Sequence, residues 1–307
     1  MKAARGNRAA FTPGRGRSMG WKKTILISAS RFSAPGWKAG ILSGFLQAGL
    51  SCVRPRKQVA LANLSLAYPD SEPSFRERTL REVYSHLAWM TAETLALQRD
   101  PAQSLSWIVR TEGEGFLRRP LESGQGIIVL TAHLGNWELL AAWLCQRGYP
   151  LTAIVRDPDD RDYCETISAF RHRVGLKTLP KTANMKAAVT LLRNGGFLGI
   201  LSDQSAGRTE GLPVPFMGHP AYTFAGAASL AILTGCPVVP VFSFREAPFR
   251  HRVEIHPPLP LPDSGDRREK ILELTRLCNQ AIEDAIRTCP GQWLWLHRRW
   301  GRHLHPA

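Results

Sequence analysis

The stretch Gly126-Ile127-Ile128-Val129-Leu130-Thr131 decides the fold. A short, continuous, largely β-branched run of this kind is typical of a strand that is buried on both faces of a sheet. The same pattern recurs at residues 151–155, 197–201 and 238–242. Helix-like periodicity occupies residues 76–97, 136–147, 163–174, 183–193, 223–234 and 267–287. This alternation predicts an α/β fold with a largely parallel central sheet and helices on both faces.

The net charge of +15 is concentrated at the two ends of the chain. Residues 1–69 hold 12 Lys and Arg without an acid, whereas the charges of residues 70–284 nearly cancel, with 24 cations and 25 acids. Proteins that wrap nucleic acid usually carry basic residues across the whole binding face. We therefore expect a near-neutral domain whose basic ends meet an anionic membrane surface, and no nucleic-acid partner. The 6 cysteines form no C-x-x-C pair, which favours a reducing, cytosolic setting.

We expect the boundaries between the parts of the chain near residues 20 and 60. Residues 1–20 are rich in Gly, Ala and Arg and predict a flexible basic tail. Residues 21–60 predict a membrane-associated helical segment, because the uncharged run 39–53 is flanked by cations. That run is shorter than the ~20 apolar residues of a typical bilayer span. A helix on the membrane surface, an ordinary packing helix and a span extended by its neighbours are all open alternatives, and residues 61–307 form the main domain.

Polar side chains follow three of the expected strands directly. In parallel sheets, reactive groups gather beyond the carboxyl ends of the strands. The segment 133–138 follows the first strand, Arg156 follows the second, and Asp203 and Gln204 follow the third. Four Asp residues lie among the six positions after Arg156, so a solvated loop in which they pair with it is the alternative to a substrate contact.

His133 and Glu138 have the spacing of a base and its orienting partner. On one continuous helix their side chains would point about 140° apart, so His133 must lie in the turn before the helix. A hydrogen bond to Glu138 would then fix the tautomer and leave the other ring nitrogen free to accept a proton. The backbone N–H groups of Gly135 and Asn136 would suit an anion or a developing oxyanion. The alternative is a helix-capping histidine beside a solvated glutamate.

The string His133-Leu134-Gly135-Asn136-Trp137-Glu138 resembles the H-x4-D/E signature of glycerolipid-type acyltransferases. In its HLGNWE form it resembles the bacterial lipid A biosynthesis lauroyl/myristoyl acyltransferase family, of the lysophospholipid acyltransferase-like superfamily. Other blocks resemble that family in the same order along most of the chain. They are residues 63–69 (NLSLAYP), Val155-Arg156, Asp203-Gln204, residues 213–218 (PVPFMG), 234–242 (TGCPVVPVF) and 292–300 (QWLWLHRRW).

The resemblance implies a glycerolipid-acyltransferase-like domain over residues 61–307. It implies transfer of a fatty acyl chain from an acyl carrier protein thioester to a hydroxyl of a lipid A precursor, in lipopolysaccharide biosynthesis at the cytoplasmic face of the inner membrane. His133 would be the general base and Glu138 its orienting partner. Arg156, Asp203 and Gln204 would contact substrate or organise the site. No metal and no cofactor is implied; the expected partners are acyl carrier protein, the glycolipid acceptor and the anionic membrane.

Other interpretations of the function and of the closing block remain open. A lysophospholipid or another lipid alcohol is an alternative acceptor, although the F-P-E-G-T-R block of glycerol-phosphate acyltransferases is incomplete at residues 210–213. A non-catalytic protein that binds anionic lipid or nucleic acid through its basic ends is an alternative of another class. The tryptophans of the closing block would serve either as an interfacial anchor or as core residues: Trp293, Trp295 and Trp300.

Overall fold

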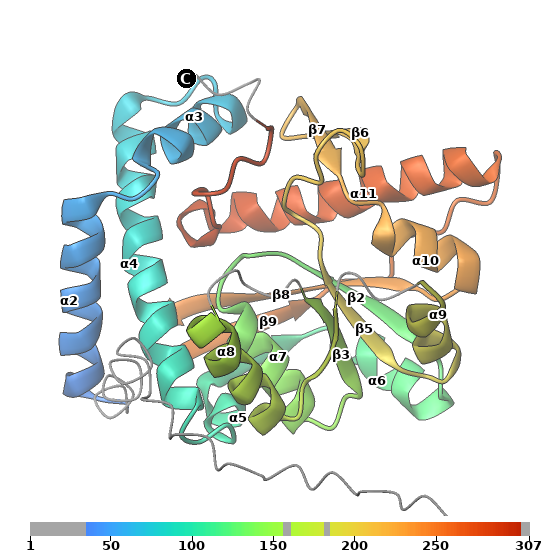
Figure 1. Cartoon of the computed structure of the whole chain (residues 1–307), viewed down its shortest axis with the longest axis horizontal. Coiled ribbons are helices and arrows are strands. Elements are labelled where there is room, and N and C mark those ends of the chain that lie inside the picture. The colour runs from blue at the N-terminus through green and yellow to red at the C-terminus, as the bar shows by residue number, and fades with distance from the viewer. Residues whose placement is uncertain (1–34, 156–160, 181–184, 302–307) are drawn as a thin grey trace, which may run out of the picture.

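The computed structural model describes residues 35–155, 161–180 and 185–301 (Figure 1). The predicted tail 1–20, the first part of the segment 21–60, and Arg156 lie outside the described residues.

A central sheet organises the described part of the chain, with its strands in the order β1-β9-β8-β2-β5-β3-β4. Strands β8 and β9 run antiparallel, and the other neighbouring pairs run parallel. The largely parallel α/β sheet is therefore confirmed. The strands are β1 (Ile108–Glu112), β2 (Ile127–Thr131), β3 (Leu151–Val155), β4 (Lys177–Pro180), β5 (Phe197–Leu201), β8 (Val238–Ala247) and β9 (Arg250–Ile255).

Strand β2 lies in the middle of the sheet, and all five of its residues are buried. Ile127 and Val129 pack into one hydrophobic cluster, whereas Ile128 and Leu130 pack into the other. This alternation explains the uniformly apolar sequence, because both faces of the strand are covered (Figure 1). One cluster includes residues of α5 (Gln103–Trp107), α6 (Gly115–Ser123), α7 (Trp137–Gln146) and α8 (Arg161–Val174); the other includes residues of α9 (Met185–Arg193), α10 (Gly226–Thr234) and α11 (Arg267–Thr288).

Three helices precede the sheet: α2 (Trp37–Val53), α3 (Lys57–Ala67) and α4 (Pro73–Leu97). Helix α2 lies alongside α4 at one edge of the molecule and buries Ala39 and Ser43 (Figure 1). Its outer side exposes an apolar row at steps of four and eight residues, namely Trp37, Ile41, Phe45 and Val53. Among the helices that the structure describes, none is both long and apolar enough to cross a bilayer.

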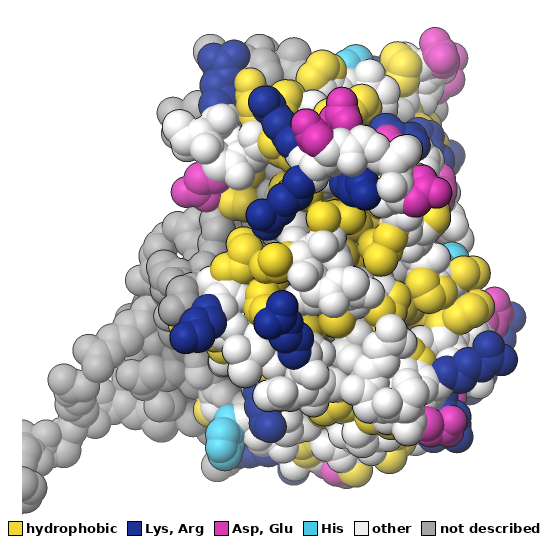
Figure 2. Space-filling view, turned by 90° about the vertical axis from the view of Figure 1, so that its right-hand side faces the viewer, with side chains coloured by type: hydrophobic (Ala, Val, Ile, Leu, Met, Phe, Trp, Pro, Cys, Tyr) yellow, Lys and Arg dark blue, Asp and Glu magenta, His cyan; other side chains and the backbone are white. Residues whose placement is uncertain are grey.

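The closing block forms part of the core. A 3-10 turn, η1 (Pro290–Gln292), leads into Trp293, Trp295 and Trp300, which are at most 2% exposed. The interpretation of these tryptophans as core residues is confirmed, and the interfacial-anchor alternative is wrong. A two-stranded hairpin, β6 (Leu212–Phe216) and β7 (His219–Thr223), packs against α11. One face of the molecule carries cations and acids interspersed, with hydrophobic side chains between them (Figure 2).

Candidate active site

The register of two adjacent strands brings His133 and Asp203 together. Strand β2 pairs in parallel with β5, and Thr131 is the register partner of Leu201. His133 lies two residues beyond the end of β2, and Asp203 lies two residues beyond the end of β5. Equal overhangs on neighbouring parallel strands place both side chains at the same edge of the sheet, where reactive groups are expected.

Asp203 makes three hydrogen bonds and is almost fully buried, with 1% of its surface exposed. The Nδ1 of His133 lies 2.8 Å from Oδ1, the His133 backbone N–H donates to Oδ2 at 3.0 Å, and the indole N–H of Trp293 donates to Oδ2 at 2.8 Å. Burial alone would raise the pKa of Asp203, but the His133 ring and these hydrogen bonds lower it to about 2. The carboxylate is therefore ionised, which favours the His133 tautomer with its proton on Nδ1.

The second ring nitrogen of His133, Nε2, is available for proton transfer. The ring is partly exposed, at 22%, and packs edge-on against Trp137 with 5.0 Å between ring centroids. Its Nε2 lies 3.4 Å from the side-chain amide nitrogen of Gln204. With the proton held on Nδ1, Nε2 carries the lone pair that can accept a proton from a hydroxyl. The structure thus brings together His133, Asp203 and Gln204.

Glu138 does not orient His133. Its carboxylate pairs with Arg171 of α8, with the guanidinium Nη2 2.6 Å from Oε1 and Nε 3.4 Å from Oε2. Glu138 is the second residue of α7, and its side chain reaches the neighbouring helix instead of turning back to the loop. The predicted hydrogen bond between His133 and Glu138 is therefore corrected: the partner of the imidazole is Asp203.

Gly135 and Asn136 position the loop; the backbone N–H of Gly135 is not free to bind an anion as we expected, whereas the expectation for the Asn136 N–H stays a prediction. The Gly135 N–H donates to the Gln292 carbonyl at 3.0 Å. The Asn136 side chain is fully buried; its oxygen accepts the Leu139 N–H at 3.0 Å and so caps α7. Gly135 has φ +59°, and a Cβ there would lie 1.7 Å from the Ser243 carbonyl oxygen. Only glycine therefore fits this turn.

The closing block completes the site, a contribution that sequence reasoning missed. The Leu294 N–H donates to the His133 carbonyl at 3.0 Å, and Leu134 forms an isolated β-bridge with Trp293. The nearby His297 ring is neutral at ordinary pH, because burial lowers its pKa to about 4 despite the Asp203 charge. A tryptophan signals core packing in a sequence, so its hydrogen bond to a site carboxylate has no local signature.

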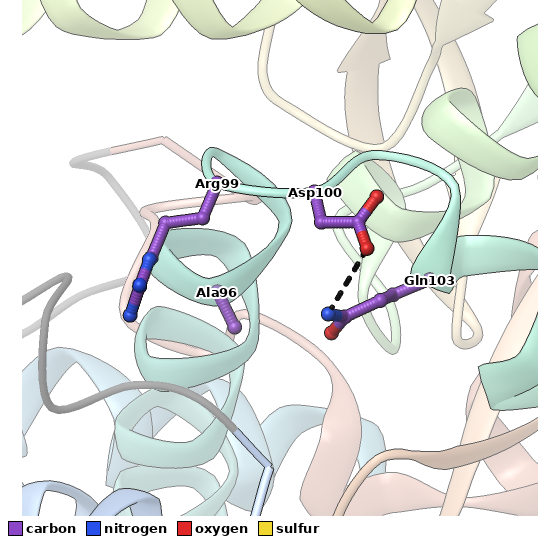
Figure 3. A pocket seen from close by; sticks show the side chains of 4 residues that line it. All are labelled: Ala96, Arg99, Asp100 and Gln103. Carbon is purple, nitrogen blue, oxygen red and sulfur yellow. Dashed lines mark hydrogen bonds between the residues drawn. The ribbon is translucent and has the colours of Figure 1, made fainter.

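A small hollow lies away from this cluster, between the end of α4 and α5 (Figure 3). Its lining includes Arg99, Asp100 and Gln103, and the Gln103 amide donates to the Asp100 carboxylate at 3.3 Å. None of the site residues lines it. Within the described ranges, no group of three or more His, Cys, Asp or Glu side chains gathers as a metal site.

Residues 42–302 match the family described as bacterial lipid A biosynthesis acyltransferase. The chain is 25% identical over 251 residues to the lipid A biosynthesis palmitoleoyltransferase of Escherichia coli, covering 80% of this chain and 79% of that one. It is 22% identical to the lipid A biosynthesis lauroyltransferase of the same organism, over 83% and 82% of the two chains. It is also 24% identical to the phosphatidylinositol mannoside acyltransferase of Mycobacterium tuberculosis, over 61% and 58%. Because the family match covers most of the chain and includes every described residue of the site, this protein belongs to the bacterial lipid A biosynthesis acyltransferase family.

Proposed function

We propose that this protein transfers a fatty acyl chain from an acyl carrier protein thioester to a hydroxyl of a membrane glycolipid of the lipid A precursor type. The observation that carries the proposal is the 2.8 Å contact between His133 Nδ1 and the buried Asp203 carboxylate. It leaves Nε2 as a base at the partly exposed end of the ring. Family membership supplies the reaction class, and the pair supplies the group that acyl transfer to a hydroxyl needs.

The reaction follows from this geometry. The acceptor hydroxyl donates its proton to His133 Nε2, while its oxygen attacks the thioester carbonyl carbon and forms a tetrahedral oxyanion. The imidazolium that results is stabilised by the ionised Asp203, whose charge lies on the other side of the ring. Collapse of the intermediate breaks the carbon–sulfur bond, and the proton passes from Nε2 to the leaving thiolate. No acyl-enzyme intermediate is required.

Gln204 and Glu138 have different parts in this proposal. The Gln204 amide nitrogen lies 3.4 Å from Nε2, in the direction from which the hydroxyl must approach, so the acceptor displaces it. Its amide is then available to donate to substrate oxygen. Glu138 holds Arg171 and thereby fixes α8 against α7 beside the site. Arg156, which lies outside the described residues, is proposed to contact the substrate.

The names of the relatives bear on the choice of acceptor. The relatives named above act, by their names, on lipid A or on phosphatidylinositol mannoside, both of which are glycolipids. We therefore favour a lipid A precursor, with a phosphatidylinositol mannoside as the second candidate and a lysophospholipid as the third. A purely nucleic-acid-binding role is disfavoured by the mixed charge of the face in Figure 2.

The proposed location is the cytoplasmic face of the inner membrane. Helix α2 exposes Trp37 at 72%, Phe45 at 75% and Val53 at 76%; it carries Lys38 in its first turn and is followed by the cations Arg54 and Arg56. An apolar row beside cations suits insertion into the headgroup layer of an anionic bilayer. Such attachment would bring the enzyme to a lipid acceptor.

The test of function offers one radiolabelled acyl chain, on acyl carrier protein, to a lipid A precursor, a phosphatidylinositol mannoside and a lysophospholipid. We expect transfer to the lipid A precursor, and no transfer by His133→Ala. His256→Ala, which truncates an exposed histidine, is the matched control and should keep the wild-type rate. Wild-type transfer by folded His133→Ala would overturn the mechanism. Transfer only to one of the other two lipids would identify that lipid as the acceptor. DNA binding as strong as vesicle binding, with no acyl transfer, would favour the non-catalytic alternative.

The test of location measures binding of the full chain to vesicles of phosphatidylethanolamine and phosphatidylglycerol. A buried phenylalanine side chain contributes about 1.5–3 kcal/mol on leaving water, so Phe45→Ser should weaken binding by about tenfold to hundredfold. Leu105→Ser removes an exposed apolar side chain from α5 and should leave binding unchanged. Equal binding of the two variants would show that α2 does not enter the bilayer.

A further inference from the structure

A buried ionic cluster lies directly behind the loop that carries His133. Its centre is Glu93 of α4, which is fully buried. The Arg245 guanidinium donates to both oxygens of this carboxylate, at 2.9 and 2.7 Å. The Phe249 N–H donates to it at 3.1 Å, and the His251 Nε2 lies 3.1 Å from the same oxygen. Burial would raise the pKa of Glu93, but Arg245 and His251 lower it well below its usual value, so this carboxylate is ionised.

Two contacts connect the cluster to the loop. The Asn136 amide donates to Glu93 Oε2 at 2.9 Å, so the residue that caps α7 is itself held by the glutamate. The His86 Nε2 contacts the Gly135 carbonyl oxygen at 3.1 Å, while its Nδ1 contacts Arg245. Because Nδ1 faces a cation that only donates, Nε2 carries the proton of the ring and donates to Gly135.

The cluster cannot act on substrate directly. Glu93 and Asn136 are fully buried, His86 is 6% exposed, and the Arg245 side chain is 8% exposed. Replacing a buried ion pair by hydrophobic residues of similar volume is often neutral or stabilising, so stability alone does not account for this cluster. It fixes the carbonyl of Gly135 and the side chain of Asn136, the second and third residues after His133.

We propose that Glu93, Arg245 and His86 are positioning residues, which hold the loop of residues 133–136 so that His133 meets both Asp203 and the substrate. The effect on catalysis rests on the proposed function, whereas the effect on the loop does not. Reacting atoms must meet within a few tenths of an ångström, and a displacement of about 1 Å can cost a hundredfold in rate. Loss of one contact between the cluster and the loop should therefore lower kcat more than it raises KM.

The first test is Asn136→Asp, which keeps the shape of the side chain and its cap of α7 but places a second carboxylate directly against that of Glu93. Repulsion between the two carboxylates raises the pKa of one of the pair. Below that pKa the pair binds one proton, which restores a hydrogen bond between positions 93 and 136. The other groups facing this pair are Arg245, His86 and His251, and they are unchanged. We expect kcat of the variant, relative to wild type, to be within about threefold at pH 6 and at least about tenfold lower at pH 8.5.

Two further variants separate positioning from general damage. Asn279→Asp makes the same change at another buried asparagine, whose oxygen accepts from Arg299 and whose amide donates to the Pro215 carbonyl and the Thr223 hydroxyl instead of to a carboxylate. Its rate relative to wild type should not depend on pH. The double variant Glu93→Gln with Asn136→Asp exchanges amide and carboxylate across the bond, and should recover at least part of the rate at pH 8.5. A pH-independent ratio for Asn136→Asp, or a double variant no better than the single one, would overturn the proposal.

A measurement without substrate keeps this test separate from the proposed reaction. In the full chain, hydrogen exchange of a peptide that contains residues 132–140 reports the Gly135 N–H, which is bonded to Gln292. We expect about tenfold faster exchange in Asn136→Asp than in wild type at pH 8, and wild-type exchange in Asn279→Asp. This result would stand even if the wild-type enzyme transferred no acyl chain. Unchanged exchange in Asn136→Asp would show that the cluster does not hold the loop.

Discussion

Replacement of Asp203 by asparagine tests the central hydrogen bond of the site. Two donors, the His133 backbone N–H and the Trp293 indole N–H, converge on Oδ2, and His133 Nδ1 alone meets Oδ1. In Asp203→Asn the amide oxygen must therefore take the place of Oδ2, which leaves the amide NH2 facing Nδ1. Nδ1 must then accept, so the ring proton moves to Nε2, and the base is lost.

The magnitude follows from that change of tautomer. A histidine base held in the wrong tautomer costs about 10³–10⁴ in kcat, or about 4–5 kcal/mol of transition-state stabilisation. Stability should fall less, by about 1.5–3 kcal/mol, since two of the three hydrogen bonds keep their direction and the third is reversed, but all of them lose the charge of the carboxylate. Rates of acyl transfer, urea unfolding and imidazole ¹⁵N chemical shifts measure the three effects. Asp100→Asn makes the same change in an exposed loop and should behave as wild type. Retention of the rate within about threefold, or an unchanged His133 tautomer, would refute the reasoning.

Three further outcomes are expected. Gly135→Ala should cost about 3 kcal/mol or more by urea unfolding, because its Cβ would overlap a β8 carbonyl oxygen, whereas Gly124→Ala, also at positive φ but in open space, should cost about 1 kcal/mol; equal costs would contradict this. Burial lowers the pKa of His86 from 6.5 to about 3, so the unfolded chain binds its proton first, and His86 should contribute a loss of stability below pH 6.5 of about 1.4 kcal/mol per pH unit, beside the similar contribution of His297. His86→Gln should flatten that slope by one proton, and an unchanged slope would show that another group causes it. Glu138→Gln should lower the rate without moving the His133 tautomer measured by NMR; a tautomer change there would return the orienting role to Glu138.

Two inner strands could be predicted to the residue, whereas β8 extends five residues beyond its expected end at 242, and β1, β4 and β9 were not predicted. Strands β3 and β5 have the expected bounds, because nearly all of their residues are apolar and buried or half-buried. Strands β1 and β4 have largely exposed residues, as in Arg110 and Lys177, and resemble loops in sequence. The helix expected at residue 76 begins at Pro73, since proline is favoured in the first turn.

The members of the site could be found singly, but their pairing could not. His133 and Asp203 were predicted because each directly follows a buried strand. Which strands are neighbours depends on the order in which the crossovers wind, and no local pattern encodes it. Glu138 was assigned to His133 because it is near in sequence, whereas the fold gives it to Arg171, 33 residues away. Glu93 on a predicted helix carried no sign that it would be buried.

The dependence of the His133 loop on residues 292–294 has a consequence for biosynthesis. The contacts from Gln292, Trp293 and Leu294 to the loop join segments about 160 residues apart. At a translation rate of about 5–20 residues per second, the ribosome needs roughly 8–30 seconds to make that interval. Until then the loop lacks the Gln292 carbonyl that accepts from Gly135 and the Leu294 N–H that donates to His133, and Asp203 lacks the indole donor of Trp293. In a nascent chain the site would therefore stay incomplete until residues 292–294 had been made and had packed against the loop.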